Sequence, residues 1–181
     1  MNNDRNNSPM PYAARILCAV AARLHAPRSA PLPPDLIPLT DWFSALAPAA
    51  ARYGGVLVKS AETARSLLAD PREKVVLHGD LHHANVLDFG ERGWLAIDPK
   101  GLLGERTFDF VNILRNPDAA TALSPGRFER QVGVLAAAAS AERQRLLDWT
   151  LAFAGLSAAW HLADGTSPDL DLAIARLALI R

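Results

Sequence analysis

This sequence of 181 residues has one cysteine, a net charge of zero and no long apolar run. Cys18 is its only cysteine, so the chain has no internal disulfide framework. A single thiol in an apolar helical segment is typical of an inert core residue in a reducing cytoplasm. The 19 basic and 19 acidic side chains cancel, and no basic run exceeds two residues. We therefore expect no nucleic-acid-binding surface.

Apolar segments long enough for a membrane are also missing. The run from Ile16 to Ala22 lies between Arg15 and Arg23, whereas the core of a signal peptide has about 7–15 apolar residues and no arginine on its far side. The run 149–160 is shorter than the roughly 20 residues of a membrane span. We expect a soluble, cytoplasmic protein without a membrane partner.

Helical periodicity organises most of the chain. Residues 1–9 are polar and rich in asparagine, which predicts a flexible tail, and residues 10–181 are predicted to form one mainly helical domain. Five prolines in residues 27–38 predict an irregular connection. The expected helices cover residues 11–26, 40–46 with Thr40 as N-cap, 60–68, 108–115, 127–139, 141–163, and 167–180 with Ser167 as the capping residue.

The central part of the chain has a different pattern. Val75-Val76-Leu77 is a β-rich run and is followed by HGDLHHAN. The next segments, NVLDF and WLAID, flank a polar GERG, which predicts a β-hairpin. The predicted fold class is therefore α+β, with helices packed around one small hairpin.

Residues 78–98 carry the pattern of a kinase catalytic loop: His78-x-Asp80, Asn85 five positions after Asp80, and Asp98 on the next strand. Phosphoryl transfer to a hydroxyl needs a carboxylate that accepts the hydroxyl proton, which assigns Asp80 as the base. Because Mg²⁺ is a hard cation that prefers oxygen ligands, the side chains of Asn85 and Asp98 are the predicted metal ligands. His78 is predicted to brace the loop by hydrogen bonding.

Strand register supports this pairing. If residues 90–93 form the turn, Phe89 lies opposite Trp94 and Asn85 lies opposite Asp98. Residues directly opposite each other have Cβ atoms about 4.5–5.5 Å apart on one face of the sheet. Both predicted ligands would then converge, although a bulge would shift the register by one residue and remove this support.

A second enzyme class has to be weighed. His78, Asp80, His82 and His83 are potential metal ligands, as in metallophosphoesterases with G-D-x-H motifs. That class also needs an upstream D-x-H strand and a later G-N-H segment, and the sequence contains neither. We therefore favour the kinase interpretation and interpret His82 and His83 as solvated loop residues.

The motifs of residues 78–110 resemble those of a known family. HGDLHHANVL is similar to the catalytic loop of aminoglycoside phosphotransferases, and IDPKGLLGERTFDF resembles their streptomycin and hydroxyurea phosphotransferase branch. The upstream ARLHAP, the proline-rich stretch and DWF resemble the same branch, so the likeness runs from about residue 13 to 116 and more weakly to the end. It implies the carboxy-terminal lobe of the protein-kinase-like fold. The implied activity is Mg²⁺-dependent transfer of a phosphate from ATP, or from GTP, to an alcohol group of a small molecule such as streptomycin.

The resemblance gives further residues an expected role. Asp109 would be a buried brace that accepts hydrogen bonds from the catalytic loop, the alternative being a carboxylate at a helix N-terminus. Lys100 would face a phosphate or the acceptor, the alternative being an exposed lysine. Glu105 matches a family position for which the sequence indicates no role.

Residues of the later helices are candidates for the acceptor pocket. The tryptophans are also typical of core positions, and an aspartate before glycine is typical of a turn. These candidates are Trp149, Trp160, His161 and Asp164.

Kinases of this type hold the nucleotide between two lobes, and the amino-terminal lobe supplies a phosphate-covering loop and a lysine. GGVLVK at 54–59 ends 21 residues before Asp80, which leaves no room for such a lobe, so we interpret it as a loop leading into a helix. We expect the chain to lack the amino-terminal lobe and to be weakly active or inactive alone. The alternative is a non-catalytic module that needs a partner lobe. An uncovered lobe interface would also favour self-association.

Overall fold

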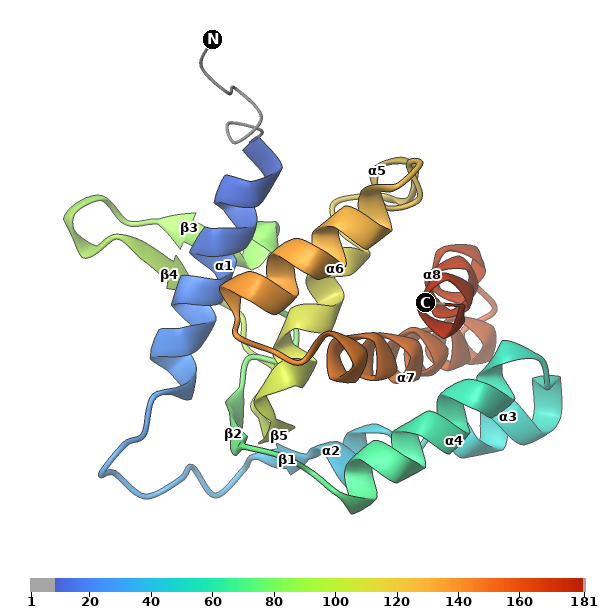
Figure 1. The fold of residues 1–181 in the computed structure, drawn as a ribbon. Helices are drawn as coiled ribbons and strands as arrows, with labels where there is room; N and C mark the ends of the chain where they lie inside the picture. The colour runs from blue at the N-terminus through green and yellow to red at the C-terminus, as the bar shows by residue number, and fades with distance from the viewer. Residues whose placement is uncertain (1–8, 181) are drawn as a thin grey trace, which may run out of the picture.

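The computed structural model describes residues 9–180 and the side chains of residues 12–180. Within this range the chain is mainly helical with two small β-sheets, and Figure 1 shows the two-stranded hairpin projecting at one side of the molecule. The predicted fold class, α+β and mainly helical, is confirmed. Residues 1–8 of the predicted tail lie outside the described residues, and Pro9 is already the first residue of a helix. None of the helices in residues 9–180 is long and apolar enough to cross a bilayer.

Four long helices match their predicted ranges to within two residues at each end, namely α1, α6, α7 and α8. With η denoting a 3₁₀ helix, the elements in chain order are α1 (Pro9–His25), β1 (Ile37–Pro38), α2 (Leu39–Trp42), α3 (Leu46–Tyr53), α4 (Val56–Ala69), β2 (Lys74–Leu77), η2 (His83–Asn85), β3 (Val86–Asp88), η3 (Gly90–Arg92), β4 (Trp94–Ala96), β5 (Leu102–Glu105), η4 (Arg106–Leu114), α5 (Ala119–Ala122), α6 (Arg127–Ala138), α7 (Arg143–Ala163) and α8 (Asp169–Leu179).

The predictions for the second and third helices are wrong at their starts. Thr40 does not cap a helix, because the extended backbone of Pro38 already ends the preceding strand and α2 begins at Leu39. The third helix begins at Val56 rather than at residue 60. Gly54 and Gly55 both have positive φ, at 65° and 61°, and form the turn that separates it from α3.

A three-stranded sheet flanks the predicted catalytic loop, with β1 and β2 before it in the chain and β5 after it. Of its strands, the sequence predicted only the β-rich run at 75–77. Its strand order is β1-β5-β2, with β1 parallel to β5 and β5 antiparallel to β2. The proline-rich stretch is therefore not irregular throughout, since its last two residues form β1. The short strands β1 and β5 have no alternating pattern, so their pairing depends on neighbours that are far away in the sequence.

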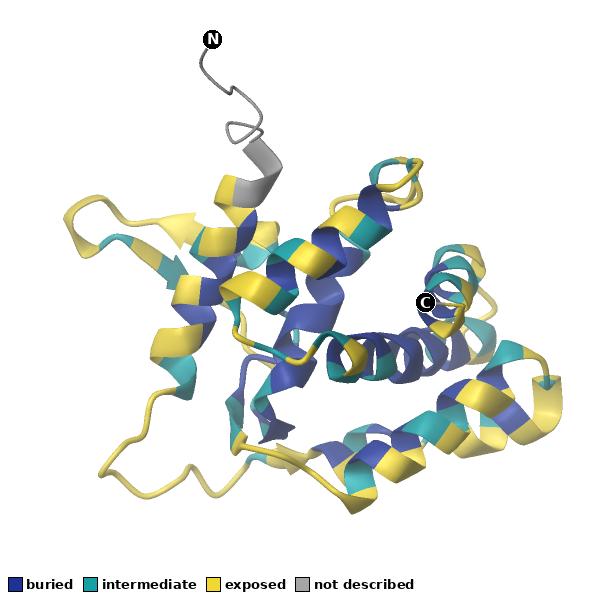
Figure 2. Cartoon of the chain, in the orientation of Figure 1, coloured by how far each residue is buried: buried dark blue, intermediate teal, exposed yellow. Residues whose placement is uncertain are grey.

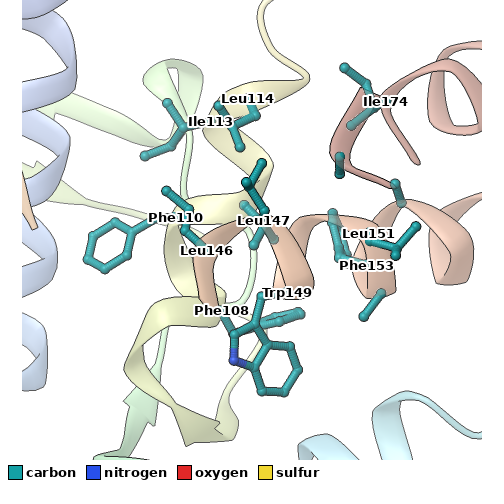
Figure 3. Close-up of a cluster of buried hydrophobic side chains, with 14 of the residues drawn as sticks. Phe108, Phe110, Ile113, Leu114, Leu146, Leu147, Trp149, Leu151, Phe153 and Ile174 are labelled. Carbon is teal, nitrogen blue, oxygen red and sulfur yellow. The ribbon is translucent and has the colours of Figure 1, made fainter. Parts of the chain in front are cut away.

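The core forms where η4 packs against α7. All residues of 107–114 are buried, and α7 is buried on most of its circumference because α4, η4 and α8 pack around it (Figure 2). Figure 3 shows Phe108 of η4 beside Trp149 of α7, with their ring centroids 5.6 Å apart in an edge-to-face contact. Such aromatic pairs contribute about 0.5–1.5 kcal/mol beyond the burial of their surface. Cys18 also lies in the core, and burial raises the pKa of its thiol to about 12.

A buried ion pair joins the end of β5 to the start of α7. Glu105 is 1% exposed and accepts hydrogen bonds from Nε and Nη2 of Arg145, at 3.0 and 2.6 Å, and from the backbone N–H of Arg72 at 3.0 Å. Burial alone would raise the pKa of Glu105, but the hydrogen bonds from Arg145 and Arg72 hold this pKa below its ordinary value. Glu105 therefore connects three segments of the fold and lies away from the cavities described below.

Replacing this carboxylate should destabilise the fold. We expect Glu105→Gln to lower the free energy of unfolding at pH 7 by about 3 kcal/mol, because Arg145 would stay buried without its counter-charge. The pKa of Glu105 is lower in the folded than in the unfolded chain. Its stabilisation is therefore complete above the unfolded pKa of about 4.3 and is lost as the pH falls through the folded pKa.

Urea unfolding of the two proteins at several pH values measures this effect. The difference between them should shrink below about pH 4. Glu62→Gln is the matched control, because Glu62 pairs with Lys59 on the exposed side of α4. This variant should leave the free energy of unfolding nearly unchanged. A stability difference that is the same at pH 3 and pH 7 would contradict this account.

Candidate active site

The predicted catalytic loop leaves the end of β2 and lies on η4. Asp109, 2% exposed, accepts the backbone N–H of His78 at 2.9 Å and that of Gly79 at 2.7 Å, one on each carboxylate oxygen. The Nε2 atom of His25, on α1, lies 2.7 Å from the same carboxylate. Asp109 is thus buried under the loop, as the sequence predicts, whereas the contact with His25 was not foreseen.

Gly79 turns the chain into the site. Its φ is +80°, and a Cβ atom here would lie 2.7 Å from Cδ1 of Leu102 and 3.1 Å from Cβ of Lys100. Only glycine combines this backbone conformation with so close an approach. The loop conformation is therefore set by a tight turn as well as by Asp109.

His78 connects the loop to the end of the hairpin. Its Nδ1 accepts the backbone N–H of Asp80 at 3.2 Å, and its Nε2 lies 2.9 Å from the carbonyl oxygen of Ile97, to which it donates. The ring is 1% exposed, and both of its nitrogens are used inside the protein. This geometry is that of a brace and leaves no nitrogen of His78 to act as a base.

Asp80 follows this brace and has a side chain that is 29% exposed. Its Oδ1 accepts a hydrogen bond of 2.6 Å from Nδ2 of Asn112. Nδ2 of Asn85 lies 3.3 Å from Oδ2 and donates at 2.9 Å to the Asp80 carbonyl oxygen. The carboxylate is therefore held on both oxygens and still reaches solvent.

The predicted hairpin register is wrong by one residue. Asp88 lies opposite Trp94, so the chain from residue 89 to 93 forms a five-residue connection that contains η3. The turn is longer than GERG because Phe89 belongs to it and bonds through its N–H to the carbonyl oxygen of Gly93. As a result, Asn85 pairs with Ile97, whose N–H donates to its carbonyl oxygen at 2.9 Å, and does not lie opposite Asp98.

Asp98 nevertheless lies in the same cluster. It has a positive φ of 57°, and its side chain is 69% exposed. Nζ of Lys100 lies 3.0 Å from Oδ2 of Asp98 and 3.5 Å from Oδ2 of Asp80. The hydrogen bond to Asp98, with the nearby charge of Asp80, raises the pKa of Lys100. Lys100 is therefore an ammonium ion held between two carboxylates.

The oxygen atoms of this cluster fit a hard divalent cation. Because the amide nitrogen of Asn85 is bonded to Asp80, its amide oxygen is the atom left for a metal. The exposed carboxylate of Asp98 supplies further oxygens, which are the ligands that Mg²⁺ prefers. Among residues 9–180, no group of three or more His, Cys, Asp or Glu side chains is placed to hold a metal.

The two loop histidines differ from each other. His83 is exposed, as expected for a solvated residue, whereas His82 is half-buried with Nε2 3.6 Å from Oδ1 of Asp80. The solvated interpretation is therefore wrong for His82. Burial lowers its pKa despite the opposing effect of Asp80, which favours the neutral ring at pH 7.

Two cavities open beside Asp80. The first, of about 340 Å³, has an aromatic wall made by Trp42, Phe153 and Trp160, and the second, of about 310 Å³, has a polar wall that includes His82, Asn116 and Asp118. They share three lining residues, Asp80, Asn112 and Arg115.

The candidates for an acceptor pocket are only partly brought together. Trp160 lines the aromatic cavity, but Trp149 lies in the core and is fully buried. His161 bonds through Nδ1 to Oγ1 of Thr166 at 2.7 Å, and Asp164 is exposed where α7 ends. Four residues that line the cavities were not predicted from the sequence, namely Trp42, Phe153, Asn112 and Arg115.

A carboxylate fixed on a rigid loop, with amide, carboxylate and ammonium groups beside it, is typical of the catalytic loop of kinase-type phosphotransferases. Comparison with known proteins agrees. A family model described as aminoglycoside/hydroxyurea antibiotic resistance kinase matches residues 7–165. The chain belongs to this family.

Curated relatives carry the same kind of name. The chain is 56% identical over 167 residues to a streptomycin 3''-kinase of Klebsiella pneumoniae, with 90% of this chain and 62% of the relative covered. It is 35% identical over 115 residues to a hydroxyurea phosphotransferase of Kitasatospora aureofaciens, with 62% of this chain and 32% of that protein covered. A streptomycin 6-kinase of Streptomyces griseus is 29% identical over 175 residues, with 84% and 52% covered. The chain thus spans between about a third and three fifths of the length of these relatives.

Removing the Asp109 carboxylate should destabilise the whole fold. Hydrogen bonds to a charged group contribute about 1.5–3 kcal/mol each, and Asp109→Ala would leave two buried N–H groups of the loop without an acceptor. We expect a loss of about 3 kcal/mol or more in the free energy of unfolding, measured by chemical denaturation. Asp35→Ala, in the exposed connection before β1, is the control and should unfold like the wild type. Equal stability of the two variants would contradict the bracing role.

Proposed function

We propose that this chain is the carboxy-terminal lobe of a small-molecule kinase that transfers the γ-phosphate of ATP to an alcohol group, with Asp80 as the base. The observation that carries the proposal is the position of the Asp80 carboxylate. It is fixed by the loop that Asp109 holds, and it borders both cavities. Asn85 and Lys100 lie at its Oδ2, and Lys100 also pairs with Asp98. Membership of the resistance kinase family supports the same reaction class.

The residues divide the chemistry between them. Asp80 accepts the proton of the acceptor hydroxyl as the oxygen attacks the γ-phosphorus and the bond from this phosphorus to the departing ADP breaks. A positioned base contributes about 10²–10⁴ in rate. Asn85 and Asp98 would hold Mg²⁺, which when bound neutralises charge on the phosphates of the donor. Lys100 places a further positive charge next to the base. His78 takes no proton and maintains the shape of the loop.

The acceptor is proposed to be an aminoglycoside of the streptomycin kind. Two of the relatives described above are named for kinases of streptomycin. The aromatic cavity supports a ring-shaped acceptor, because Trp42 and Trp160 offer flat apolar surfaces to the C–H faces of a sugar while Asp80 is within the same cavity.

The direct test is transfer of labelled γ-phosphate to a panel of aminoglycosides, streptomycin first. Kinases of this type bind the nucleotide between two lobes. The chain is therefore assayed alone and joined to the part of the streptomycin 3''-kinase that lies outside the matched region. We expect transfer in the joined protein and little in the chain alone. Absence of transfer to every hydroxylated acceptor in a folded joined protein would overturn the proposal and favour a non-catalytic module.

Variants of the site identify the residues responsible. Asp80→Ala and Asp98→Ala should each lower the rate of transfer by at least about 10²-fold, because they remove the base and a metal ligand. Asp88→Ala, an exposed carboxylate on β3, is the matched control and should keep the wild-type rate. Circular dichroism establishes that all three variants fold. Wild-type rates in Asp80→Ala would contradict the assignment of the base.

The aromatic cavity generates a separate prediction. Trp160→Ala should raise KM for streptomycin by roughly 10-fold, because one stacking surface is worth about 1–1.5 kcal/mol, while KM for ATP stays unchanged. Steady-state kinetics in the joined protein measure both constants. Tyr53→Ala, an exposed aromatic residue at the end of α3, serves as the control. A change in KM for ATP alone would place the acceptor elsewhere.

A further inference from the structure

A row of polar side chains on η4 faces the site. A 3₁₀ helix has three residues per turn, so side chains three apart lie on one face. Asp109 and Asn112 have this spacing, and Arg115 follows at the next position, directly after the helix ends. Asp109 bonds the loop backbone, Asn112 bonds the carboxylate of Asp80, and Arg115 bonds Ser157 at 2.6 Å. Polar side chains three residues apart on one buried helix therefore bond the loop, bond Asp80 and line the two cavities.

The contact between Asn112 and Asp80 is the tightest that the Asp80 carboxylate makes among the described residues. Nδ2 of Asn112 lies 2.6 Å from Oδ1, whereas the contacts at Oδ2 are 3.3 Å to Asn85 and 3.5 Å to Lys100. Asn112 is 7% exposed, and the residues on either side of it in η4, from 107 to 114, are all buried. The donor is therefore held in place by the core rather than by the loop.

We propose that Asn112 is a positioning residue of the transfer reaction, an inference that rests on the proposed function. By holding Oδ1 it fixes the rotation of the Asp80 carboxylate about its Cβ–Cγ bond. Oδ2, whose contacts are longer, is then the oxygen that faces the acceptor hydroxyl and takes its proton. Without Asn112 the carboxylate turns toward the other cations and donors around it, Lys100 and His82, and the attacking oxygen loses its alignment.

Two variants of similar size test this role by steady-state kinetics in the joined protein. Asn112→Leu removes the donor, and Asn112→Asp replaces it with a like charge beside Asp80. Each should lower kcat by about 10–100-fold, since small misplacements of a reacting group have effects of this size, while KM for ATP changes less than about twofold. Thr150→Val is the control for lost stability, because it removes a buried side-chain hydrogen bond away from the site, within α7. It should keep the wild-type kcat below its melting temperature. A kcat loss in Asn112→Leu no larger than that of Thr150→Val would overturn the proposal.

A double-mutant cycle separates positioning from general support of the fold. If Asn112 acts through Asp80, adding Asn112→Leu to Asp80→Ala should leave the residual rate unchanged, because the carboxylate to be positioned is gone. Losses that multiply in the double variant would show that Asn112 acts independently of Asp80 and would overturn the proposal.

A spectroscopic measurement gives an answer that does not depend on activity. In a ¹H–¹⁵N spectrum of the chain, the side-chain amide of Asn112 is assigned by its loss in Asn112→Leu. Its hydrogen bond to a carboxylate should shift one amide proton downfield, and Asp80→Ala should return it to the position of a free amide. An amide that is unshifted in the wild type and insensitive to Asp80→Ala overturns the contact itself. A shifted amide in the chain, together with no transfer to any acceptor in the joined protein, overturns the proposed function instead.

Discussion

The arrangement of the site depends on one buried carboxylate, that of Asp109. Two backbone N–H groups at the turn of the loop both point at it, so the loop can have this shape only while the charge beneath it is present. A buried charge is costly unless it is paired and hydrogen-bonded. The loop N–H groups and His25 supply these partners, and in return the carboxylate sets the position of Gly79, from which the chain turns to Asp80. Neither the charge nor the loop would be stable in this form without the other.

This dependence extends from the site to the core, because Asp109 lies on η4. The apolar residues of the same helix, among them Phe108 and Leu114, pack against α7, so a shift of η4 relative to α7 would open the core and also move the base (Figure 3). Packed interiors resist such shifts, since side chains interdigitate with few voids. The rigidity that the proposed phosphoryl transfer would require of its positioning groups is therefore obtained from the burial of aromatic side chains next to Asp109 on the same helix.

Local sequence patterns predicted the parts of the protein that local interactions decide. The long helices have clear periodicity, and the loop residues His78, Asp80 and Asn85 lie in one short motif, so both were found from the sequence. Strand register was not, because it depends on whether Phe89 extends strand β3 or joins the turn, and the polar GERG fits either outcome. The sheet β1-β5-β2 was missed for a related reason: the run at 75–77 indicated β2, but β1 and β5 have two and four residues and carry no pattern that points to their pairing.

The residues that complete the site come from elements far from the loop in sequence, and this limits what a motif can reveal. Asn112 lies 32 positions after Asp80, and no rule of spacing within the loop points to it. What could have pointed to it is the period of three in a stretch that is otherwise apolar, where Asp109, Asn112 and Arg115 recur on one side. Polar residues are rarely buried in such a row unless each has a partner, because an unpaired buried polar group is destabilising. Because η4 is a 3₁₀ helix rather than an α-helix, these polar residues lie on one aligned face, on which Asp109 bonds the loop, Asn112 bonds Asp80, and Arg115 lines both cavities.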